Sequence, residues 1–395
     1  MTADRPLRVL HVIDRLGIGG AETWLMELLR HWSKTGAARM ELLATSGERG
    51  IFDGEAIQLG ARIHYVSYRR TNLPRFLKQF RRLLADGRYD VIHDHADYVS
   101  GWHFLMGAGR LPPSRVTHVH NPWLHIEANY GVSVPRRFTA IAGKRLVHLL
   151  ATDVCGTSAE ILRQYGFDPG AASGPAVSVA HCGIDVAKFN APRQEDRESV
   201  LREFGWSQDS NIALFAGRLD RALVFDHPQN HKNSWFAVNV ARAAAAKDPT
   251  MRLLMAGAGD EPRRQIESHI RSWGLQGALR VLGVRDDVPR LMRASDALLF
   301  PSRQEGLGMV AVEAQAASLP VLASTAVPRE CVVIPELYEA LSLSAGMDVW
   351  VDALLKTTRK QRPSLESCRA ALESSPFSIA NSAGRLERIY RTTAT

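Results

Sequence analysis

The sequence has few cysteines and no long hydrophobic run. Its 395 residues include four cysteines, which lie far apart and form no CxxC pair. This pattern excludes a disulfide framework and a zinc knuckle, and it is typical of reduced thiols in a cytosol. No stretch approaches about eighteen consecutive apolar residues, and the N-terminus MTADRPLRVLHVIDRLGIGG lacks the pattern of a signal peptide. We therefore expect a cytoplasmic protein that does not span a membrane.

Composition and charge narrow the class further. With 45% hydrophobic and 23% charged residues, the chain can bury the cores of two soluble domains. Its net charge of +8 implies attraction to anions. Much of this excess lies between Arg62 and Arg88, where Asp86 is the one acid. Because no aromatic–basic interleaving, helix-turn-helix pattern or zinc-finger spacing accompanies these cations, nucleic-acid binding is disfavoured.

Short apolar runs alternate with amphipathic segments along the chain. A run such as RVLHVID (8–14) is typical of a buried strand, and AETWLMELLRHW has helical spacing. This alternation predicts parallel sheet covered by helices. Strands are predicted at 8–14, 40–46, 62–66, 90–95, 115–120, 151–156, 211–217, 251–257, 278–283, 296–302 and 319–324, and helices of the second half near 232–247, 260–273, 287–294 and 307–318.

The pattern stops at a polar stretch near 184–198, which we interpret as an interdomain linker. The predicted fold is α/β, with two doubly wound, Rossmann-like domains that face a deep cleft. The domains span residues 1–185 and 186–376, and a C-terminal helix at about 377–395 packs back on the first. Ligands of such sheets bind beyond the carboxyl ends of the strands.

Glycines follow the first predicted strand in LGIGGAE and begin the first predicted helix. Free amides and the helix dipole at this point favour a phosphate or another anion. The third glycine of a dinucleotide fingerprint would fall at residue 22, which is Glu22. An anion site and a simple packing turn are equal alternatives here.

Two cations of the second half lie where a ligand would bind. Arg218 follows a strand in FAGRLD, and Lys232 begins a helix in HKN. An arginine fork and a lysine point charge together suit a diphosphate. The alternative is a pair of solvated surface cations, which is the commoner fate of such residues.

The stretch EGLGMVAVEAQA places Glu305 and Glu313 eight positions apart. In a continuous helix they would be separated by roughly 12 Å, too far for the carboxylate pair of a glycoside hydrolase. The spacing suits a long ligand held at two points. Gly306 and Gly308 allow close approach of the backbone, and a helix N-terminus there favours a phosphate. A ribose diol is a natural partner for Glu313, whose alternative is a core ion pair with an arginine.

The stretch HDHAD at 93–97 is the best metal candidate. It places His93 and His95 on one side of a strand, and two histidines with two aspartates could bind zinc. Polar residues at a strand end are more often hydrogen-bonded structure, so we predict no metal.

Several longer motifs occur in a specific order. They are RVLHVIDRLGIGGAE, VAHCGIDVAKF, AGRL with a following KN, LLMAGAGDEPRRQIE, VLGVRDDVPRLMRASDALLFPS and the E-x7-E of EGLGMVAVEAQA. Together they resemble the retaining glycosyltransferases of family 4, which have the GT-B fold. The GVRDDV, EAQAA and PRE runs are most similar to the exopolysaccharide-biosynthesis enzymes of that family.

The resemblance implies roles for individual residues. Glu305 would hold the transferred sugar, Glu313 would bind the ribose, and the amides of Leu307 and Gly308 would touch the diphosphate. The backbone around Val284 and Arg285 would line the base. Across the cleft, Gly19 and Gly20 of the first domain would lie beside the donor phosphates and the acceptor, and His120 would lie beside the transferred sugar.

Arg218 and Lys232 would neutralise the diphosphate as it leaves. In the family the lysine follows the arginine by only a few residues, whereas here the insertion RALVFDHPQN (221–230) separates them, which makes Lys232 the less secure assignment. Cys182 also stands where asparagine is usual, which puts a hinge contact in doubt.

The implied activity is retaining transfer of a hexosyl unit from a nucleotide sugar, expected to be UDP-linked, to a lipid-linked or glycan acceptor in surface or exopolysaccharide synthesis. The leaving phosphate would take the acceptor's proton, so no metal or other cofactor is expected. A GT-B nucleotide-sugar epimerase and a non-catalytic glycan- or nucleotide-binding protein are the alternatives. No nucleic-acid partner is expected.

The basic segment NLPRFLKQFRRLLADG predicts an amphipathic helix. Its cations Arg75, Lys78 and Arg82 lie opposite an apolar stripe of Leu73, Phe76, Leu77, Phe80 and Leu84. The simpler interpretation is a solvated charged face. The sharper one is that the helix 72–88, with Arg69 and Arg70, binds an anionic membrane, which would place the enzyme peripherally on the inner face of the cell membrane.

Overall fold

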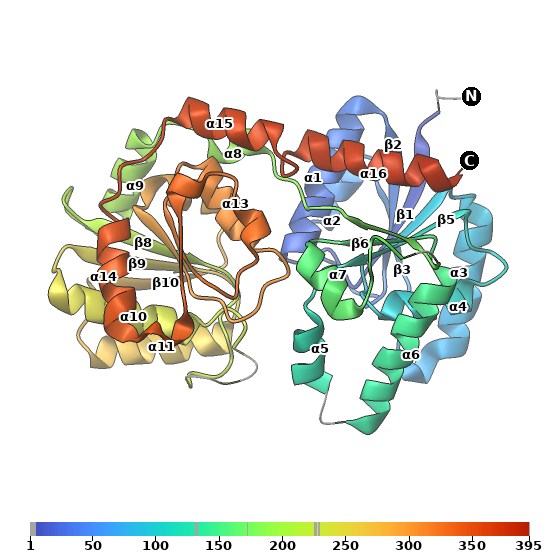
Figure 1. Cartoon of the computed structure of the whole chain (residues 1–395), viewed down its shortest axis with the longest axis horizontal. Helices are drawn as coiled ribbons and strands as arrows, with labels where there is room; N and C mark the ends of the chain where they lie inside the picture. Colours follow the sequence, from blue (N-terminus) through green and yellow to red (C-terminus); the bar gives the residue numbers. More distant parts are fainter. Residues whose placement is uncertain (1–4, 131–132, 172, 225–226, 228–229, 395) are drawn as a thin grey trace. The chain divides into compact units, whose positions relative to one another are not determined.

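The computed structural model describes residues 5–130, 133–171, 173–224, 227 and 230–394 (Figure 1). The chain divides into two compact units. Unit 1 comprises Met1–Ile184 and Pro376–Thr395, and unit 2 comprises Asp185–Ser375. Each unit has its own parallel sheet flanked by helices (Figure 1). The predicted α/β class with two Rossmann-like sheets is thereby confirmed.

Unit 1 contains a seven-stranded parallel sheet in the order β3-β2-β1-β4-β5-β6-β7. The chain winds outward in both directions from β1, so the topological switch point lies between β1 and β4. The strands are β1 (Leu7–Ile13), β2 (Ala38–Ala44), β3 (Arg62–Tyr65), β4 (Val91–Asp94), β5 (Ser114–Val119), β6 (Asp153–Gly156) and β7 (Ala176–Val179).

Helix α1 (Gly20–Thr35) shows how the sequence sets an element of unit 1. Trp24, Leu28 and Trp32 recur at helical spacing and are buried. The helix ends because Gly36 adopts the left-handed conformation at φ 69° and donates its N–H to Trp32 O. The other helices of unit 1 are α2 (Asp53–Gln58), η1 (Arg70–Asn72), α3 (Leu73–Gly87), α4 (Val99–Gly107), α5 (Trp123–Tyr130), α6 (Val134–Leu150), α7 (Ala159–Tyr165) and α16 (Ile379–Ala394).

The C-terminal helix α16 belongs to unit 1, although unit 2 separates it from the rest in sequence. Trp24 Nε1 donates to Ser382 Oγ at 3.0 Å, and Trp32 Nε1 donates to a carboxylate oxygen of Glu387 at 2.8 Å. Tyr390 is completely buried beside the sheet. These contacts hold α16 against α1.

Unit 2 contains a six-stranded parallel sheet in the order β10-β9-β8-β11-β12-β13, with its switch point between β8 and β11. Its strands are β8 (Asn211–Ala216), β9 (Met251–Ala256), β10 (Leu279–Gly283), β11 (Ala297–Phe300), β12 (Val321–Ser324) and β13 (Tyr338–Leu341). Its helices are α8 (Val186–Phe189), α9 (Gln194–Phe204), α10 (Ser234–Lys247), α11 (Asp260–Ser272), α12 (Val288–Ala294), α13 (Met309–Ala316), η2 (Arg329–Cys331), η3 (Pro335–Leu337), η4 (Leu343–Ala345), α14 (Met347–Thr357) and α15 (Leu365–Ser374).

The chain passes from unit 1 to unit 2 at Ile184/Asp185, at the start of the stretch 184–198 that was predicted as the linker. The rest of that stretch is not a linker, because it forms α8 and the start of α9, both part of unit 2. Arg193 and Arg197 of this stretch form ion pairs with Asp296, which is buried before β11. These two arginines therefore attach α9 to the second sheet rather than facing solvent.

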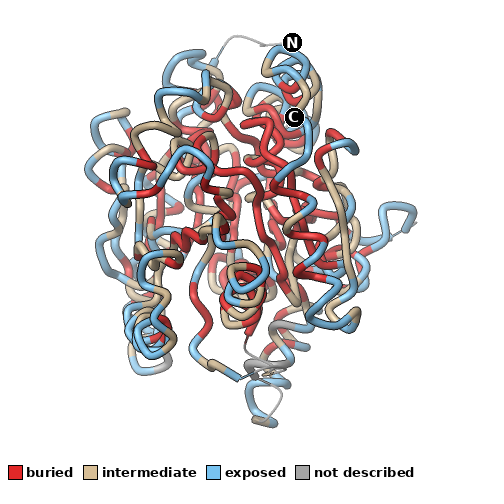
Figure 2. The backbone as a smooth tube through the Cα atoms, turned by 90° about the vertical axis from the view of Figure 1, so that its left-hand side faces the viewer, coloured by how far each residue is buried: buried red, intermediate tan, exposed pale blue. Residues whose placement is uncertain are grey.

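Buried residues are concentrated along the central strands of each sheet (Figure 2), whereas the edge strands β3, β7 and β13 consist of exposed or half-buried residues. One core cluster in unit 1 gathers around residues such as Leu10, Ile92 and Phe80, and one in unit 2 around Phe215 and Trp350. Within the described residues, every helix is too short or too polar to pass through a bilayer.

Candidate functional site

In unit 2, Lys232 and Glu305 form an ion pair beyond the carboxyl ends of the strands. Lys232 Nζ donates to Glu305 Oε1 at 2.6 Å, although the residues are 73 positions apart. The Glu305 side chain is 8% exposed and that of Lys232 28%, so the pair is shielded while the lysine remains accessible. The insertion 221–230 therefore does not prevent Lys232 from reaching the loop after β11. A bound diphosphate would compete with Glu305 for this ammonium group.

Asp220 shapes the loop that presents Lys232. Its Oδ1 accepts from the backbone N–H of Lys232 at 3.1 Å, and its Oδ2 accepts from the N–H of Ser234 at 2.8 Å and from the hydroxyl of the same residue. Asn233 between them adopts a left-handed conformation at φ 57°. Asp220 is buried and was not singled out in the sequence, although an aspartate after a strand is a frequent cap of a nearby helix.

Positive charge gathers around His231. Burial, followed by the neighbouring charges of Arg218 and Lys232, lowers the pKa of His231 to about 4. The backbone carbonyl of His231 accepts from the N–H of Arg303 at 2.8 Å, which ties the lysine loop to the loop that carries Glu305. Arg218 is exposed two residues after β8. The predicted cations thus lie at one edge of one sheet, beside a neutral histidine.

The helix in the E-x7-E run begins at Met309, so Glu305 lies in the preceding loop. The separation of roughly 12 Å, which assumes a continuous helix, is therefore the wrong geometry for this pair. Gly308 is required at the junction: its φ is 95°, and a Cβ there would lie 2.8 Å from Val327 Cγ1. Leu307 is buried, and Glu313 is half-buried on α13.

The residues predicted to line a base follow β10. Val284 is 50% exposed. The guanidinium of Arg285 makes two hydrogen bonds to Asp287, at 2.7 and 2.8 Å, and one to Glu203 at 3.1 Å. The arginine hydrogen bonds lower the pKa of Asp287 to about 2. Because its side chain is held in this network, Arg285 fits the predicted role through its backbone.

In unit 1, Gly19 and Gly20 mark the start of α1, as predicted. Gly19 precedes the helix, and a Cβ on it would lie 2.3 Å from Glu22 Oε2. The Glu22 carboxylate therefore folds back over the helix N-terminus, and burial raises its pKa. It occupies the position where the helix dipole would favour an external anion, so a phosphate there would have to displace it.

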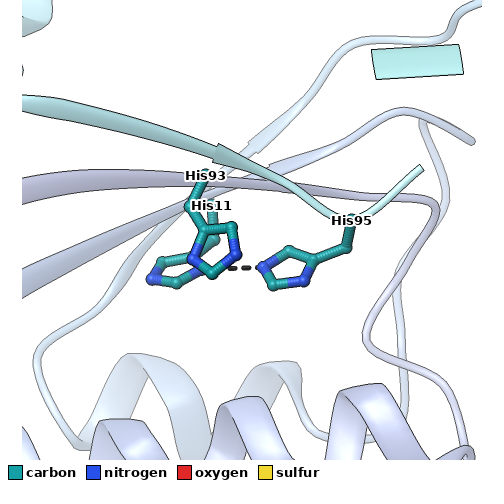
Figure 3. Close-up of side chains that lie close together, drawn as sticks. All are labelled: His11, His93 and His95. Carbon is teal, nitrogen blue, oxygen red and sulfur yellow. Dashed lines mark hydrogen bonds between the residues drawn. The ribbon is translucent and has the colours of Figure 1, made fainter. Parts of the chain in front are cut away.

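Five histidines gather on one face of the unit 1 sheet, and they form two hydrogen-bonded strings. In the first histidine string, defined as His11, His95 and His120, His11 Nδ1 lies 2.9 Å from His95 Nε2, and His95 Nδ1 lies 3.0 Å from His120 Nε2. Figure 3 shows His11 and His95 with the bond between them, and His93 beside them. In the second histidine string, defined as Tyr390, His93 and His118, the Tyr390 hydroxyl bonds His93 Nδ1, and His93 Nε2 lies 3.2 Å from His118 Nδ1.

The register of the strands explains this cluster. His11 of β1 and His93 of β4 are paired in register, and alternate residues of a strand share a face. His95 continues that face beyond β4, and His118 and His120 lie on β5 and just after it. The rings stack closely, with centroids 4.2 Å apart for His93 and His95 and 4.3 Å for His118 and His120.

The two histidines and two aspartates of HDHAD, considered as a metal candidate, do not converge on one site. Asp94 Oδ2 lies 2.7 Å from His103 Nδ1 in a buried pair, and its Oδ1 accepts from the Ser100 hydroxyl. Asp97 Oδ1 accepts from the backbone N–H of His120 at 2.8 Å. The alternation of strand side chains places His93 and His95 on one face and Asp94 on the other, so the motif is divided.

Two groups of three imidazoles could instead offer nitrogens to a metal. They are His11, His93 and His95, and His95, His118 and His120. Nitrogens bound to one tetrahedral zinc lie about 3.3 Å apart, as follows from Zn–N distances near 2.05 Å. The distances of 2.9 and 3.0 Å along the first string are shorter and fit hydrogen bonds between neutral rings. Burial lowers the pKa of His11 and of His120 to about 3, which favours the neutral form.

His120 is the partly exposed end of the first string. Asp97 fixes its backbone, and the same carboxylate accepts from the Asn121 amide at 2.7 Å. Burial raises the pKa of Asp97 to about 6, against the opposing effect of these hydrogen bonds. Sequence reasoning identified His120 but missed the contributions of His11, His118 and Tyr390. The recurrence of histidine in RVLHV, VIHDH and VTHVH was the available signal.

Helix α3 only partly follows its predicted pattern. Phe76, Phe80 and Leu84 are buried, whereas Leu73 and Leu77 are 39% and 37% exposed. The buried stripe is narrower than predicted because the two leucines lie at its margin. The predicted cations are exposed on this helix, namely Arg75, Lys78 and Arg82, the last of which pairs with Asp86 at 3.3 Å.

Comparison with known proteins identifies the class. The family described as "Glycosyltransferase Family 4" matches residues 18–188, and "Glycosyl transferases group 1" matches residues 211–353, so that the two matches cover most of the chain. The chain belongs to the glycosyltransferases of family 4, as the sequence motifs predicted.

Among its relatives is the glycosyltransferase EpsF of Bacillus subtilis (strain 168), 29% identical over 97% of this chain and 96% of that protein. The UDP-Gal:alpha-D-GlcNAc-diphosphoundecaprenol alpha-1,3-galactosyltransferase of Escherichia coli is 24% identical over 78% of this chain and 77% of its own length. Anabaena HepE, solved in complex with UDP, has a TM-score of 0.74 at 17% identity and covers 98% of this chain and 100% of its own. WaaG, a glycosyltransferase involved in lipopolysaccharide biosynthesis, has a TM-score of 0.68 at 15% identity, with 98% of both chains covered. These likenesses show that the fold is GT-B.

Proposed function

We propose that the protein is a retaining glycosyltransferase that moves a hexosyl unit from a UDP-linked sugar to a lipid-linked or glycan acceptor in surface or exopolysaccharide synthesis. The observation that carries the proposal is the Lys232–Glu305 ion pair at the carboxyl edge of the unit 2 sheet, with Arg218 on the neighbouring strand end. A partly accessible ammonium group held by a buried carboxylate is poised to exchange partners when an anionic donor binds.

In this proposal unit 2 binds the donor. Arg218 and Lys232 hold the diphosphate together with the amides of Leu307 and Gly308, and Glu313 accepts hydrogen bonds from the ribose hydroxyls. Glu305, released from Lys232, holds a hydroxyl of the transferred sugar. The backbone at Val284 and Arg285 lines the base. The UDP bound to HepE and the UDP-galactose named for the Escherichia coli relative support a uridine donor.

Unit 1 in this proposal binds the acceptor and completes the donor site with Gly19, Gly20 and His120. The bond from the sugar carbon to the diphosphate breaks while the acceptor oxygen forms its bond on the same face. The leaving phosphate oxygen takes the acceptor's proton. Arg218 and Lys232 stabilise the charge that develops on the diphosphate, which needs groups preorganised before the reaction. The reaction we propose needs no metal.

The acceptor and the place of action are the finer parts of the proposal. A lipid-linked acceptor requires the enzyme to reach a bilayer, and we assign peripheral binding at the cytoplasmic face of the membrane to the basic helix α3. Its exposed Arg75, Lys78 and Arg82 support this assignment, since clusters of cations are attracted to anionic lipid.

The test is a screen of the purified protein against UDP, GDP and ADP sugars by thermal shift, because a ligand of the folded state raises the melting temperature. The stabilising donor is then incubated with diphosphate-lipid and oligosaccharide acceptors, and the anomeric configuration of the product is read by NMR. We expect stabilisation by a UDP-sugar and a product with the donor's configuration. An inverted product, or conversion of the donor without any acceptor as in an epimerase, would refute the proposal.

A further inference from the structure

The first histidine string runs from the interior of unit 1 to the partly exposed His120. Both ring nitrogens of His95 are used, one toward His11 at 2.9 Å and the other toward His120 at 3.0 Å. A neutral imidazole has one N–H and one lone pair. Each hydrogen bond therefore needs an N–H on one ring and a lone pair on the other. The donors must then run either from His11 through His95 to His120, or from His120 through His95 to His11.

The inner end of the string decides between these directions. His11 Nε2 is buried and has no hydrogen-bond partner within the described part of the chain. If the donors run from His120 to His11, this atom carries a buried N–H without an acceptor. If they run from His11 to His120, it carries only a lone pair. Buried N–H groups without acceptors are the rarer case in folded proteins, so the second direction is favoured.

The hydrogens of the string are then assigned. His11 Nδ1–H donates to His95 Nε2, and His95 Nδ1–H donates to His120 Nε2. The hydrogen of His120 must lie on its Nδ1, the nitrogen that the string leaves available to a ligand. The ring is also fixed in place, since it stacks on His118 at 4.3 Å and its backbone N–H donates to Asp97 at 2.8 Å.

We propose that His11 and His95 are positioning residues that hold His120 as its Nδ1–H tautomer, so that His120 offers a hydrogen-bond donor to an oxygen of the bound sugar. The sugar as ligand rests on the proposed function, whereas the tautomer does not. The second histidine string lies in the same cluster but does not contain His120. It therefore provides a control at equal depth in the same sheet.

The first test is NMR of the full-length protein at pH 7 with ring-15N histidine, in which two-bond 1H–15N correlations show which nitrogen carries the hydrogen. His120→Asn assigns the His120 signals. We expect Nδ1–H in the wild type and loss of this preference in His95→Leu. A wild-type His120 found as Nε2–H, or as the imidazolium, would overturn the inference. So would about one equivalent of bound transition metal that is lost in His95→Leu.

The second test compares His95→Leu with His93→Leu, since each removes a buried imidazole and leaves two hydrogen-bonding partners unpaired. We expect His95→Leu to lower kcat about 10- to 100-fold with a smaller change in donor KM, and His93→Leu to stay within about threefold of the wild type. His95→Gln should recover most of the loss, because its amide can accept from His11 and donate to His120.

Equal losses in the two leucine variants would indicate a merely structural role and would overturn the inference. The tautomer of His120 and the proposed function can be tested separately. If NMR finds the Nδ1–H tautomer but no sugar is transferred, the proposed function fails while the assignment of the string stands.

Discussion

The carboxyl edges of the two sheets share a topology but differ in their polar chemistry. At the β1/β4 switch point of unit 1 the side chains are buried imidazoles that bond one another as neutral rings. At the β8/β11 switch point of unit 2 they are charged, with Lys232 paired to Glu305 and Arg218 nearby. The same fold therefore supports two kinds of site. Neutral donors suit the orientation of an uncharged group, whereas cations suit the charge of a diphosphate.

Acidification should give the largest effect, and it should act mainly on the neutral edge, because five histidines with a lowered pKa lie there whereas, among the described residues, His231 alone lies at the charged edge. Burial lowers the pKa of His11 and His120 to about 3, and it lowers the pKa of His93, His95 and His118 well below the ordinary value. The unfolded chain then binds more protons below pH 6.5, so stability is lost as the pH falls from 6.5 toward the folded pKa values. Each such histidine contributes about 1.4 kcal/mol per pH unit in this window.

Asp97 acts in the opposite sense, because its pKa is raised to about 6 and the folded state holds this proton between pH 6 and the ordinary value of 3.8. The raised pKa of Glu22 acts in the same sense, and two carboxyl groups offset at most two of the five histidines. Urea unfolding at pH 7.5, 6 and 5 measures the net slope. Hydrogen exchange should accelerate on acidification in β1, β4 and β5 more than in β8 and β11, and equal acceleration in both sheets would contradict the comparison.

The contrast also shows what sequence can predict. The central strands of both sheets were predictable because runs of Val, Ile and Leu mark strands buried on both faces. The edge strands β7 and β13 were missed because AVSV and YEAL have exposed or half-buried residues and a weak apolar pattern. The stretch 184–198 was misread because its charges form ion pairs with a buried aspartate rather than facing solvent.

The charged edge was largely predictable, and the neutral edge was not. Arg218, Lys232 and Glu305 each follow or precede a recognisable strand or helix, so the rule for parallel sheets places them together. The ion pair between Lys232 and Glu305, which are 73 residues apart, was evident only from the structure. The histidine strings depend on the register between three strands, and no local spacing specifies that register.

Helix α3 of unit 1 carries the exposed cations Arg75, Lys78 and Arg82, and reversal of their charge should give the next largest effect. Arg75→Glu, Lys78→Glu and Arg82→Glu together should lower partition into anionic liposomes about 100-fold at low salt, since each cation near an anionic leaflet contributes about 1 kcal/mol. Nucleotide binding should be unchanged. Cosedimentation with anionic and neutral liposomes measures the difference.

Helix α6 provides the comparison variant for this experiment. Val134, Phe138 and Ile141 recur at helical spacing and are 82%, 70% and 39% exposed, beside the exposed Arg137. If Phe138→Ser abolishes cosedimentation while the α3 reversal has no effect, the membrane contact belongs to α6 and the assignment to α3 is wrong.

Removal of one cation from the charged edge should weaken the diphosphate site. We expect Arg218→Ala to lower the affinity for free UDP about 30-fold, which corresponds to the loss of one charge-assisted contact. Stability should change little because Arg218 is exposed. Arg221→Ala, three residues further on and also exposed, is the matched control. Calorimetric titration with UDP measures both, and unchanged affinity in Arg218→Ala would remove this residue from the clamp.

The smallest expected effect distinguishes the roles of the two carboxylates at the charged edge, Glu305 and Glu313, and so sharpens the comparison within unit 2. Glu305→Gln releases Lys232 from its ion pair, so free UDP should bind at least as tightly as to the wild type while sugar transfer slows. Glu313→Gln should weaken UDP about tenfold, because a carboxylate accepts stronger hydrogen bonds from the ribose hydroxyls than an amide does. Its effect should shrink for 2′-deoxy-UDP, which lacks one of these hydroxyls. Equal losses of UDP affinity in the two variants would show that Glu305 and Glu313 do not divide the sugar and the ribose between them.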